Sequence, residues 1–264
     1  MDTYIYYIAY GFYLISTAMY ISYLFNGNKT VINGGEKVLT LAFLIHTISL
    51  LYRWILAARP PLTNQYEFAS AFAWGIAVVF LYLAYKHRFN SFGVFVNPVI
   101  LLIATYSLFL SKEIAPLMPT LQSNWLFFHV FSAVLAYGSF AVSFALGILS
   151  IVKHKMTSLL KNLPLEKLDD WIYKTISFGF LLLTLTIITG AIWAQKAWTR
   201  YWAWDPKETW SLITWIIYAV FLHLRLNKGV KGSTLAWFSI IGFASVLFTY
   251  IGVNYILPGL HSYL

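Results

Sequence analysis

The sequence contains no cysteine, and charged side chains make up only 10% of its 264 residues. Without cysteine the chain cannot form a disulfide, ligate an iron–sulfur cluster or use a thiolate as nucleophile or redox centre. Soluble domains carry about 25% charged residues, so this chain is not an ordinary soluble domain. Basic residues outnumber acidic ones by 18 to 9. Lysines and arginines scattered between apolar runs more often set membrane topology than bind nucleic acid. We therefore do not consider a nucleic-acid-binding function further.

Long uncharged runs take the place of the missing charges, and hydrophobic residues make up 60% of the chain. A helix needs about 20 such residues to cross the hydrocarbon core of a bilayer. The runs predict an all-α polytopic membrane protein, one domain over residues 1–264, with about eight transmembrane helices. The first run opens on Met-Asp without a basic segment, which favours an uncleaved helix over a signal peptide. The expected spans are residues 4–24, 38–56, 68–85, 89–110, 125–152, 175–194, 209–224 and 234–254.

Eight spans place both termini on one side of the membrane, and the distribution of positive charge selects that side. The connections after the first, third, fifth and seventh spans hold 12 of the 18 basic residues. Because the side richer in lysine and arginine faces the cytoplasm, we expect both termini on the outer, extracytoplasmic side.

Tryptophan is concentrated in one outer segment, where residues 193–215 hold six of the 11 tryptophans. One interpretation is an aromatic belt at the membrane interface. The other is a binding surface for a large flat apolar ligand with polar edges, because indoles supply rigid contact area.

Two segments carry the spacing of a helix start. Asp205 fits an N-cap, Pro206 the first helical position and Glu208 the third, as in a capping box. Asn64 and Glu67 repeat the spacing before the third span. These residues therefore need no catalytic role to be explained.

Three segments together resemble one family. They are residues 198–210 (WTRYWAWDPKETW), 46–54 (HTISLLYRW) and 61–67 (PLTNQYE). The first is similar to the WWD signature of haem-handling proteins of cytochrome c biogenesis, and the other two to the CcsA (ResC) branch. The resemblance runs from about residue 40 to the C-terminus. Relatives usually carry glycine after the first of these tryptophans, whereas this chain has Thr199, which bears on the turn geometry of the loop.

The resemblance implies that the chain moves haem across the membrane and presents it outside for covalent attachment to the Cys-x-x-Cys-His motif of apocytochrome c, as a subunit of a haem lyase. It implies bis-histidine haem b as ligand. The implied partners are a CcsB/ResB-type membrane protein with a large outer domain, apocytochrome c and thiol-reducing proteins. The implied location is a bacterial inner membrane, or a thylakoid membrane if the gene is plastid-encoded. The alternatives are a haem exporter that loads a chaperone, and a transporter or quinone-site subunit without haem.

Histidine is a standard axial ligand of haem iron. His129 and His261 are expected at the outer ends of their segments, level with the tryptophans, and the resemblance points to the same pair. The residues expected to contact haem are Trp193, Trp198, Trp202, Trp204, Asp205 and Trp210.

Three further polar residues fall within expected spans, where ionisable side chains are functional candidates. The resemblance favours His223 as a ligand whose opposing histidine comes from the partner, against an interfacial histidine beside Arg225. His46 fits a ligand or a buried histidine bonded to helix backbone. Arg53 fits a propionate partner or a side chain that snorkels outward. His87 and His154 lie in basic clusters and are expected to be solvated.

Overall fold

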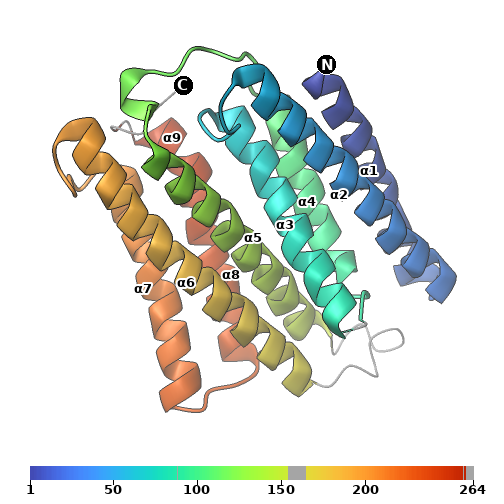
Figure 1. The fold of residues 1–264 in the computed structure, drawn as a ribbon. Coiled ribbons are helices and arrows are strands. Elements are labelled where there is room, and N and C mark those ends of the chain that lie inside the picture. Colours follow the sequence, from blue (N-terminus) through green and yellow to red (C-terminus); the bar gives the residue numbers. More distant parts are fainter. Residues whose placement is uncertain (88, 154–164, 258, 260–264) are drawn as a thin grey trace.

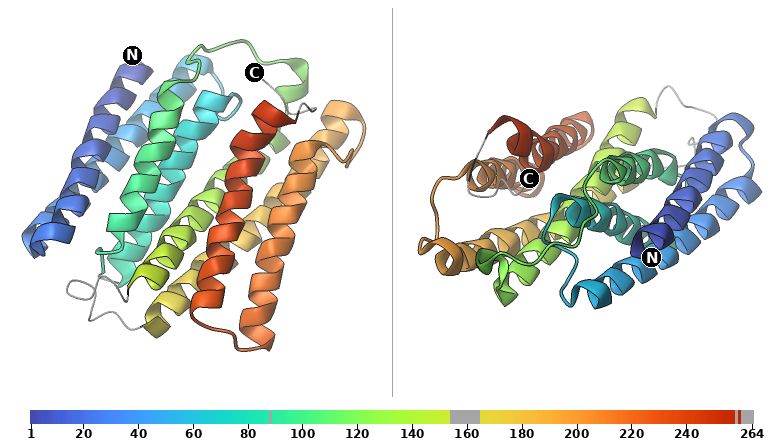
Figure 2. Two further views of the ribbon diagram at one scale, coloured as in Figure 1. Left: turned by 180° about the vertical axis from the view of Figure 1, so that it is seen from behind. Right: turned by 90° about the horizontal axis from the view of Figure 1, so that it is seen from above.

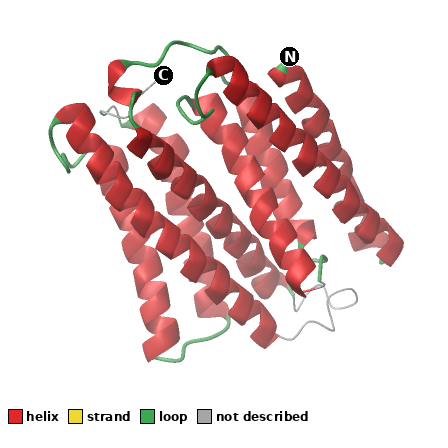
Figure 3. Ribbon diagram, viewed as in Figure 1, coloured by secondary structure: helices red, strands yellow, loops and turns green. Residues whose placement is uncertain are grey.

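The computed structural model describes residues 1–87, 89–153, 165–257 and 259, and every regular element among them is helical (Figure 3). The all-α prediction is therefore confirmed. The elements are α1 (Asp2–Asn26), α2 (Lys29–Ala57), α3 (Gln65–His87), α4 (Gly93–Leu108), the short 3-10 helix η1 (Pro119–Leu121), α5 (Asn124–Val152), α6 (Leu165–Trp198), α7 (Pro206–Asn227), α8 (Ser233–Leu247), the π-helical segment η2 (Phe248–Gly252) and α9 (Val253–Ile256).

Eight apolar helical stretches make up the bundle in the described part of the chain. Over the described residues, seven stretches are long and apolar enough to span a membrane, the last of them running from Ser233 through η2 to Ile256. The eighth, α4, is apolar but has only 16 residues, a rise of about 24 Å against about 30 Å of hydrocarbon. The protein is thus a multi-pass membrane protein.

The helices form a bundle with α5 at its centre (Figures 1 and 2). α5 packs against α3, α6 and α8, while α1 and α2 pair at one edge and α7 lies at the opposite edge. α1 begins and α9 ends at the end of the bundle that also carries η1 and the α6–α7 loop. We call this the loop end. The common end agrees with an even number of crossings.

Two helices extend well beyond the expected spans. α2 begins at Lys29 rather than residue 38, because the Asn28 side chain caps it by accepting the Thr30 N–H. α6 begins at Leu165 rather than residue 175. Charged residues limit the length of an apolar run, but they are good helix formers, so the helix continues where the membrane span stops.

The last span is not one regular α-helix. η2 inserts five π-helical residues between α8 and α9. A Cβ at Gly252 would lie 2.6–3.0 Å from the Phe248 ring, so the segment needs glycine there. π-helical segments inside helices commonly occur at functional sites. Here Thr249 and Tyr250 of the segment line the cavity described next.

Candidate functional site

A cavity opens at the loop end of the bundle. Its free space, including the open mouth, is about 1170 Å³. Helices α5 and α6, the α2–α3 and α6–α7 loops, and the α8–α9 span supply its walls. Every lining residue lies between Leu62 and Asn254, so α1 and α2 contribute none.

His129 lies in the α5 wall and its ring rests against α6. A Cβ at Gly190 would come within 2.6 Å of the His129 Nδ1 atom, so only glycine permits this approach. Nδ1 donates a hydrogen bond of 2.8 Å to the Thr186 carbonyl. This bond fixes the tautomer in which Nε2 carries the lone pair, the arrangement that orients a metal-binding histidine. The Trp193 ring stacks on the imidazole at 5.9 Å, with 20° between the planes.

The expected haem-contacting tryptophans divide into three groups. Trp193 and Trp202 line the cavity. Trp198 supports Trp193 edge-on, with ring centres 4.8 Å apart. Trp204 is 69% exposed, and Trp210 packs on Phe248 of η2 at 4.2 Å. Trp193 and Trp202 therefore form part of the cavity wall, whereas the other three tryptophans pack elsewhere or face outward.

The α6–α7 loop is shaped by two left-handed residues and a capping box. Thr199 has φ 60° and Trp204 has φ 56°, so threonine adopts here the conformation that suits glycine. The predicted capping box is confirmed: the Asp205 side chain accepts the Lys207 N–H, and the Glu208 carboxylate accepts the N–H groups of Ala203 and Asp205. Asp205 therefore acts as a helix cap.

Aromatic side chains form the floor of the cavity. Phe68 of α3, Tyr137 of α5 and Tyr250 of η2 all line it. Phe68 lies 4.7 Å from Tyr250 and 6.0 Å from Tyr137, ring centre to ring centre. The Tyr250 hydroxyl donates to the Gln65 carbonyl at 3.0 Å, which ties η2 to the start of α3.

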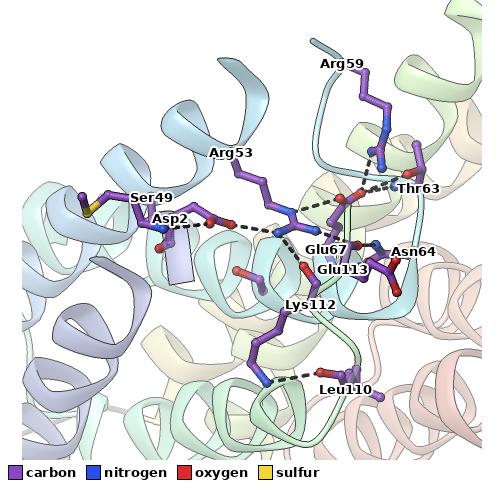
Figure 4. Close-up of polar contacts among 12 residues, drawn as sticks. Asp2, Ser49, Arg53, Arg59, Thr63, Asn64, Glu67, Leu110, Lys112 and Glu113 are labelled. Atoms are coloured by element: carbon purple, nitrogen blue, oxygen red, sulfur yellow. Dashed lines mark hydrogen bonds and ion pairs between the residues drawn. The ribbon is translucent and has the colours of Figure 1, made fainter. Parts of the chain in front are cut away.

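A buried ion cluster centred on Glu67 holds the α2–α3 loop beside this floor (Figure 4). The carboxylate accepts hydrogen bonds from Arg53 Nε at 3.0 Å, Arg59 Nη1 at 2.9 Å, and the Thr63 N–H and hydroxyl at 2.9 and 3.0 Å. Arg53 also binds Asp2 Oδ2 at 2.8 Å. We call these five residues the Glu67 cluster. It joins α1, α2 and α3 and fixes Thr63 in the cavity wall.

The cluster corrects two expectations. Arg53 is 2% exposed and binds two carboxylates as well as the Lys112 and Glu113 carbonyls, so it neither snorkels outward nor faces the cavity. Asn64 caps α3 by accepting the Glu67 N–H at 2.8 Å. The reciprocal half of a capping box is missing, because the Glu67 side chain is held by the two arginines.

His46 does not fit a ligand role in this conformation. It is fully buried, with Nδ1 hydrogen-bonded to the Tyr13 hydroxyl at 3.1 Å and Nε2 to the Ser70 hydroxyl at 2.8 Å. Both ring nitrogens are therefore engaged. Its partners are side chains of α1 and α3, not the helix backbone that the sequence suggested.

The other histidines lie away from the cavity or outside the described residues. His223 is exposed near the far end of α7, where Nδ1 accepts a hydrogen bond from Asn227 at 2.9 Å. Arg225 turns instead toward the Tyr173 ring. His87, expected to be solvated, packs on Trp171 with ring centres 5.0 Å apart. His154 and His261 lie outside the described residues.

Several lining residues escape detection in the sequence. Tyr137 and Asn254 are isolated polar side chains in apolar spans and carry no motif. Gln65 lies in the 61–67 segment, but nothing in that segment marks it as a cavity residue. Lys207 stands inside the tryptophan-rich string of residues 198–210 and could have been found as one of its two basic residues, with Arg200. Among the described residues, no three His, Cys, Asp or Glu side chains gather as a metal site.

Comparison with known proteins identifies the family. A sequence model described as "Cytochrome C assembly protein" matches residues 62–261. The chain belongs to this cytochrome c assembly family. The "Cytochrome c biogenesis protein CcsA" of Guillardia theta is 39% identical, with 95% of this chain and 92% of that protein aligned. The protein of the same name in Prochlorococcus marinus (strain MIT 9301) is 34% identical, over 84% of this chain and 82% of that protein. The chain thus functions in cytochrome c biogenesis.

A solved structure named "Cytochrome c Heme Lyase CcmF" shares the fold. It superposes with a TM-score of 0.74 over 95% of this chain at 18% sequence identity. The chain spans about half of that lyase, 46% of its length. The architecture is therefore common to both proteins.

Proposed function

We propose that the chain presents haem b in the loop-end cavity for covalent attachment to apocytochrome c, as a subunit of a haem lyase. The observation that carries the proposal is His129, an imidazole oriented by Thr186 and stacked on Trp193 in the wall of an aromatic cavity. Porphyrin faces are flat and apolar, and the floor of Phe68, Tyr137 and Tyr250 offers matching area. The lining residues thus fit haem.

The proposed axial pair is His129 and His261. Gly259, two residues before His261, lies against Asp205 and Pro206 at the start of α7, so the chain approaches the tryptophan loop there. These two histidines would hold the iron, and one of them would give way to a histidine of the incoming cytochrome. His46 and Arg53 are not part of this proposal, because their polar atoms are engaged elsewhere.

The thiols must come from the substrate, since this chain has no cysteine. Each reduced cysteine of the Cys-x-x-Cys-His motif adds its sulfur and its hydrogen across one haem vinyl group, without net oxidation. The chain's contribution is to hold and orient the porphyrin and to exclude competing geometries. Thiol-reducing proteins and a CcsB/ResB-type membrane partner complete the proposed system, in a bacterial inner membrane or a thylakoid membrane, with both termini outside.

His223 is proposed as an earlier haem position on the route outward. It lies on the exposed face of α7, where a histidine of the membrane partner could oppose it. On this proposal His223→Ala depletes haem in the cavity in cells, and haem added from outside restores it. A variant with wild-type haem before any addition removes His223 from the route.

The experiment is haem content and visible spectrum of the chain purified with its membrane partner. Bis-histidine haem gives sharp bands on reduction, whereas a transporter without haem gives none. His129→Ala and His261→Ala should each lose haem, and added imidazole should restore it by filling the vacant position. Unchanged spectra in both variants without imidazole contradict the axial pair. Haem retention without thioether formation in a reconstituted reaction would favour a haem exporter instead.

A further inference from the structure

Three buried polar atoms in the cavity wall have no hydrogen-bond partner among the described residues. They are Gln65 Nε2, Trp202 Nε1 and Asn254 Oδ1. The described part of the chain has seven such atoms, and these three line one cavity. A buried polar atom without a partner costs free energy, so each calls for an explanation. Their convergence points to a ligand that supplies the missing bonds.

The orientation of each group indicates what the ligand must offer. The Tyr106 hydroxyl donates to Gln65 Oε1 at 3.5 Å, which leaves the Gln65 NH₂ group to donate elsewhere. An indole N–H can only donate. The Asn254 side chain, with a residue exposure of 7%, can present its carbonyl or its NH₂ by rotation of the amide. The wall thus offers at least two donors and one adaptable amide.

The wall contains one basic and one acidic side chain. Lys207 lines the cavity and brings a positive charge. Glu208 also lines it, but its carboxylate caps the loop by accepting the N–H groups of Ala203 and Asp205. A hydrogen bond from a neutral N–H group to a charged carboxylate is stronger than one to a neutral acceptor, so the donors of the wall favour a carboxylate.

These polar groups and His129 belong to different parts of the cavity wall. Gln65 begins α3, Asn254 lies in α9 and Trp202 lies in the α6–α7 loop. His129 contacts α6 through Thr186 and Gly190. The Tyr250–Gln65 bond brings α3 and η2 together one turn before Asn254. A flat ligand held at its centre by His129 can therefore place its edge on this polar group.

We infer that Gln65, Trp202 and Asn254 form a carboxylate subsite that recognises the propionate edge of the porphyrin. The inference rests on the proposed function and deepens it, because it assigns the residues that orient the ligand. The subsite holds the carboxylates in the wall of α3 and α9. That orientation determines which edge of the porphyrin stays accessible for attachment of the cytochrome.

The test compares two probes, iron protoporphyrin IX and its dimethyl ester, in which the carboxylates are blocked. Affinity is measured by spectral titration of the full chain purified with its membrane partner. Wild-type protein should bind the free acid about a hundredfold tighter than the ester, because the Gln65 and Trp202 donors each contribute about tenfold toward a charged carboxylate. Gln65→Leu and Trp202→Phe should each lower affinity for the free acid about tenfold more than they lower affinity for the ester.

The controls separate this subsite from general damage. Gln122→Leu and Trp237→Phe change the same residue types at exposed positions that do not line the cavity, and should keep the wild-type preference. Gln65→Glu adds a negative charge and should reject the free acid but not the ester, which supplies a second variant if Gln65→Leu does not fold. Equal affinity of wild-type protein for both probes overturns the subsite alone. Failure of wild-type protein to bind either probe overturns the proposed function with it.

Discussion

Removal of a single partner from the Glu67 cluster should destabilise the protein more than any exposed ion pair does. Glu67 is completely buried and accepts four hydrogen bonds, two of them from arginines. Glu67→Gln leaves two buried guanidinium groups with Asp2 as the remaining carboxylate of the cluster. Breaking a buried ion pair in this way costs about 3–5 kcal/mol. Arg59→Ala should cost less, about 1.5–3 kcal/mol, because Glu67 keeps Arg53.

A double-mutant cycle on Arg53→Ala and Glu67→Ala isolates the coupling between the two side chains. We expect a coupling free energy of about 2 kcal/mol, within the range for residues of one ionic network. This value exceeds the coupling of a typical interhelical hydrogen bond in a membrane protein, which is about 0.6 kcal/mol. The measurement is reversible unfolding by dodecyl sulfate in mixed micelles, followed by circular dichroism.

The matched control is the pair Lys174–Asp170 in α6. Its charged atoms are only 2.6 Å apart, but the side chains are 54% and 43% exposed. Solvent screening should reduce its coupling to about 0.5 kcal/mol or less. If the Arg53–Glu67 coupling does not exceed that of the control pair, burial does not strengthen the cluster and the reasoning is refuted.

Three further substitutions test the cavity and its loop. Gly190→Ala should displace the His129 ring and lower haem per protein, because the new Cβ would lie 2.6 Å from Nδ1. Gly11→Ala should leave haem per protein unchanged, because a Cβ there would meet no atom within 4 Å. Equal haem content in the two variants refutes the importance of the close approach. Thr199→Gly should raise the free energy of unfolding by up to about 1 kcal/mol, because it removes the strain of a β-branched residue in the left-handed conformation. Thr189→Gly inside α6 should lower the free energy of unfolding by a similar amount. A decrease at both positions contradicts the strain argument. Trp202→Ala should lower haem per protein more than Asp205→Asn, because asparagine still caps a helix whereas the lost indole lines the cavity; the opposite order would reverse the roles assigned to the two residues.

The spans and the start of α7 could be predicted from the sequence because local chemistry determines them. The length of each uncharged run matches the thickness of the hydrocarbon core that a helix must cross. The order Asp205, Pro206, Glu208 predicts a capping box, which forms as expected. The start of α3 shows the limit of such reasoning. Asn64 and Glu67 have the same spacing, yet Glu67 turns to Arg53 and Arg59, because buried guanidinium groups bind a carboxylate more strongly than a backbone N–H does.

The cavity could be predicted only where a residue type is rare. His129 and the clustered tryptophans could be predicted because the chain has only six histidines and because six of its 11 tryptophans fall within residues 193–215. Gln65, Tyr137 and Asn254 are brought together by helix packing and by the π-helical segment η2, which no sequence pattern announced. The surroundings of His46 could not be predicted for the same reason: its neighbours Tyr13 and Ser70 come from α1 and α3, and only tertiary structure pairs them with it.

The boundary of the family match coincides with a physical division of the molecule. The match begins at residue 62, where the cavity wall also begins. α1 and α2 lie before it and supply no lining side chain, yet Asp2 and Arg53 reach Glu67, whose carboxylate holds Thr63 in the wall. The helix pair therefore acts on the cavity through one carboxylate. Because that carboxylate is buried and shared by two arginines, a change in how α1 and α2 sit against α3 would alter the position of the Leu62–Gln65 wall.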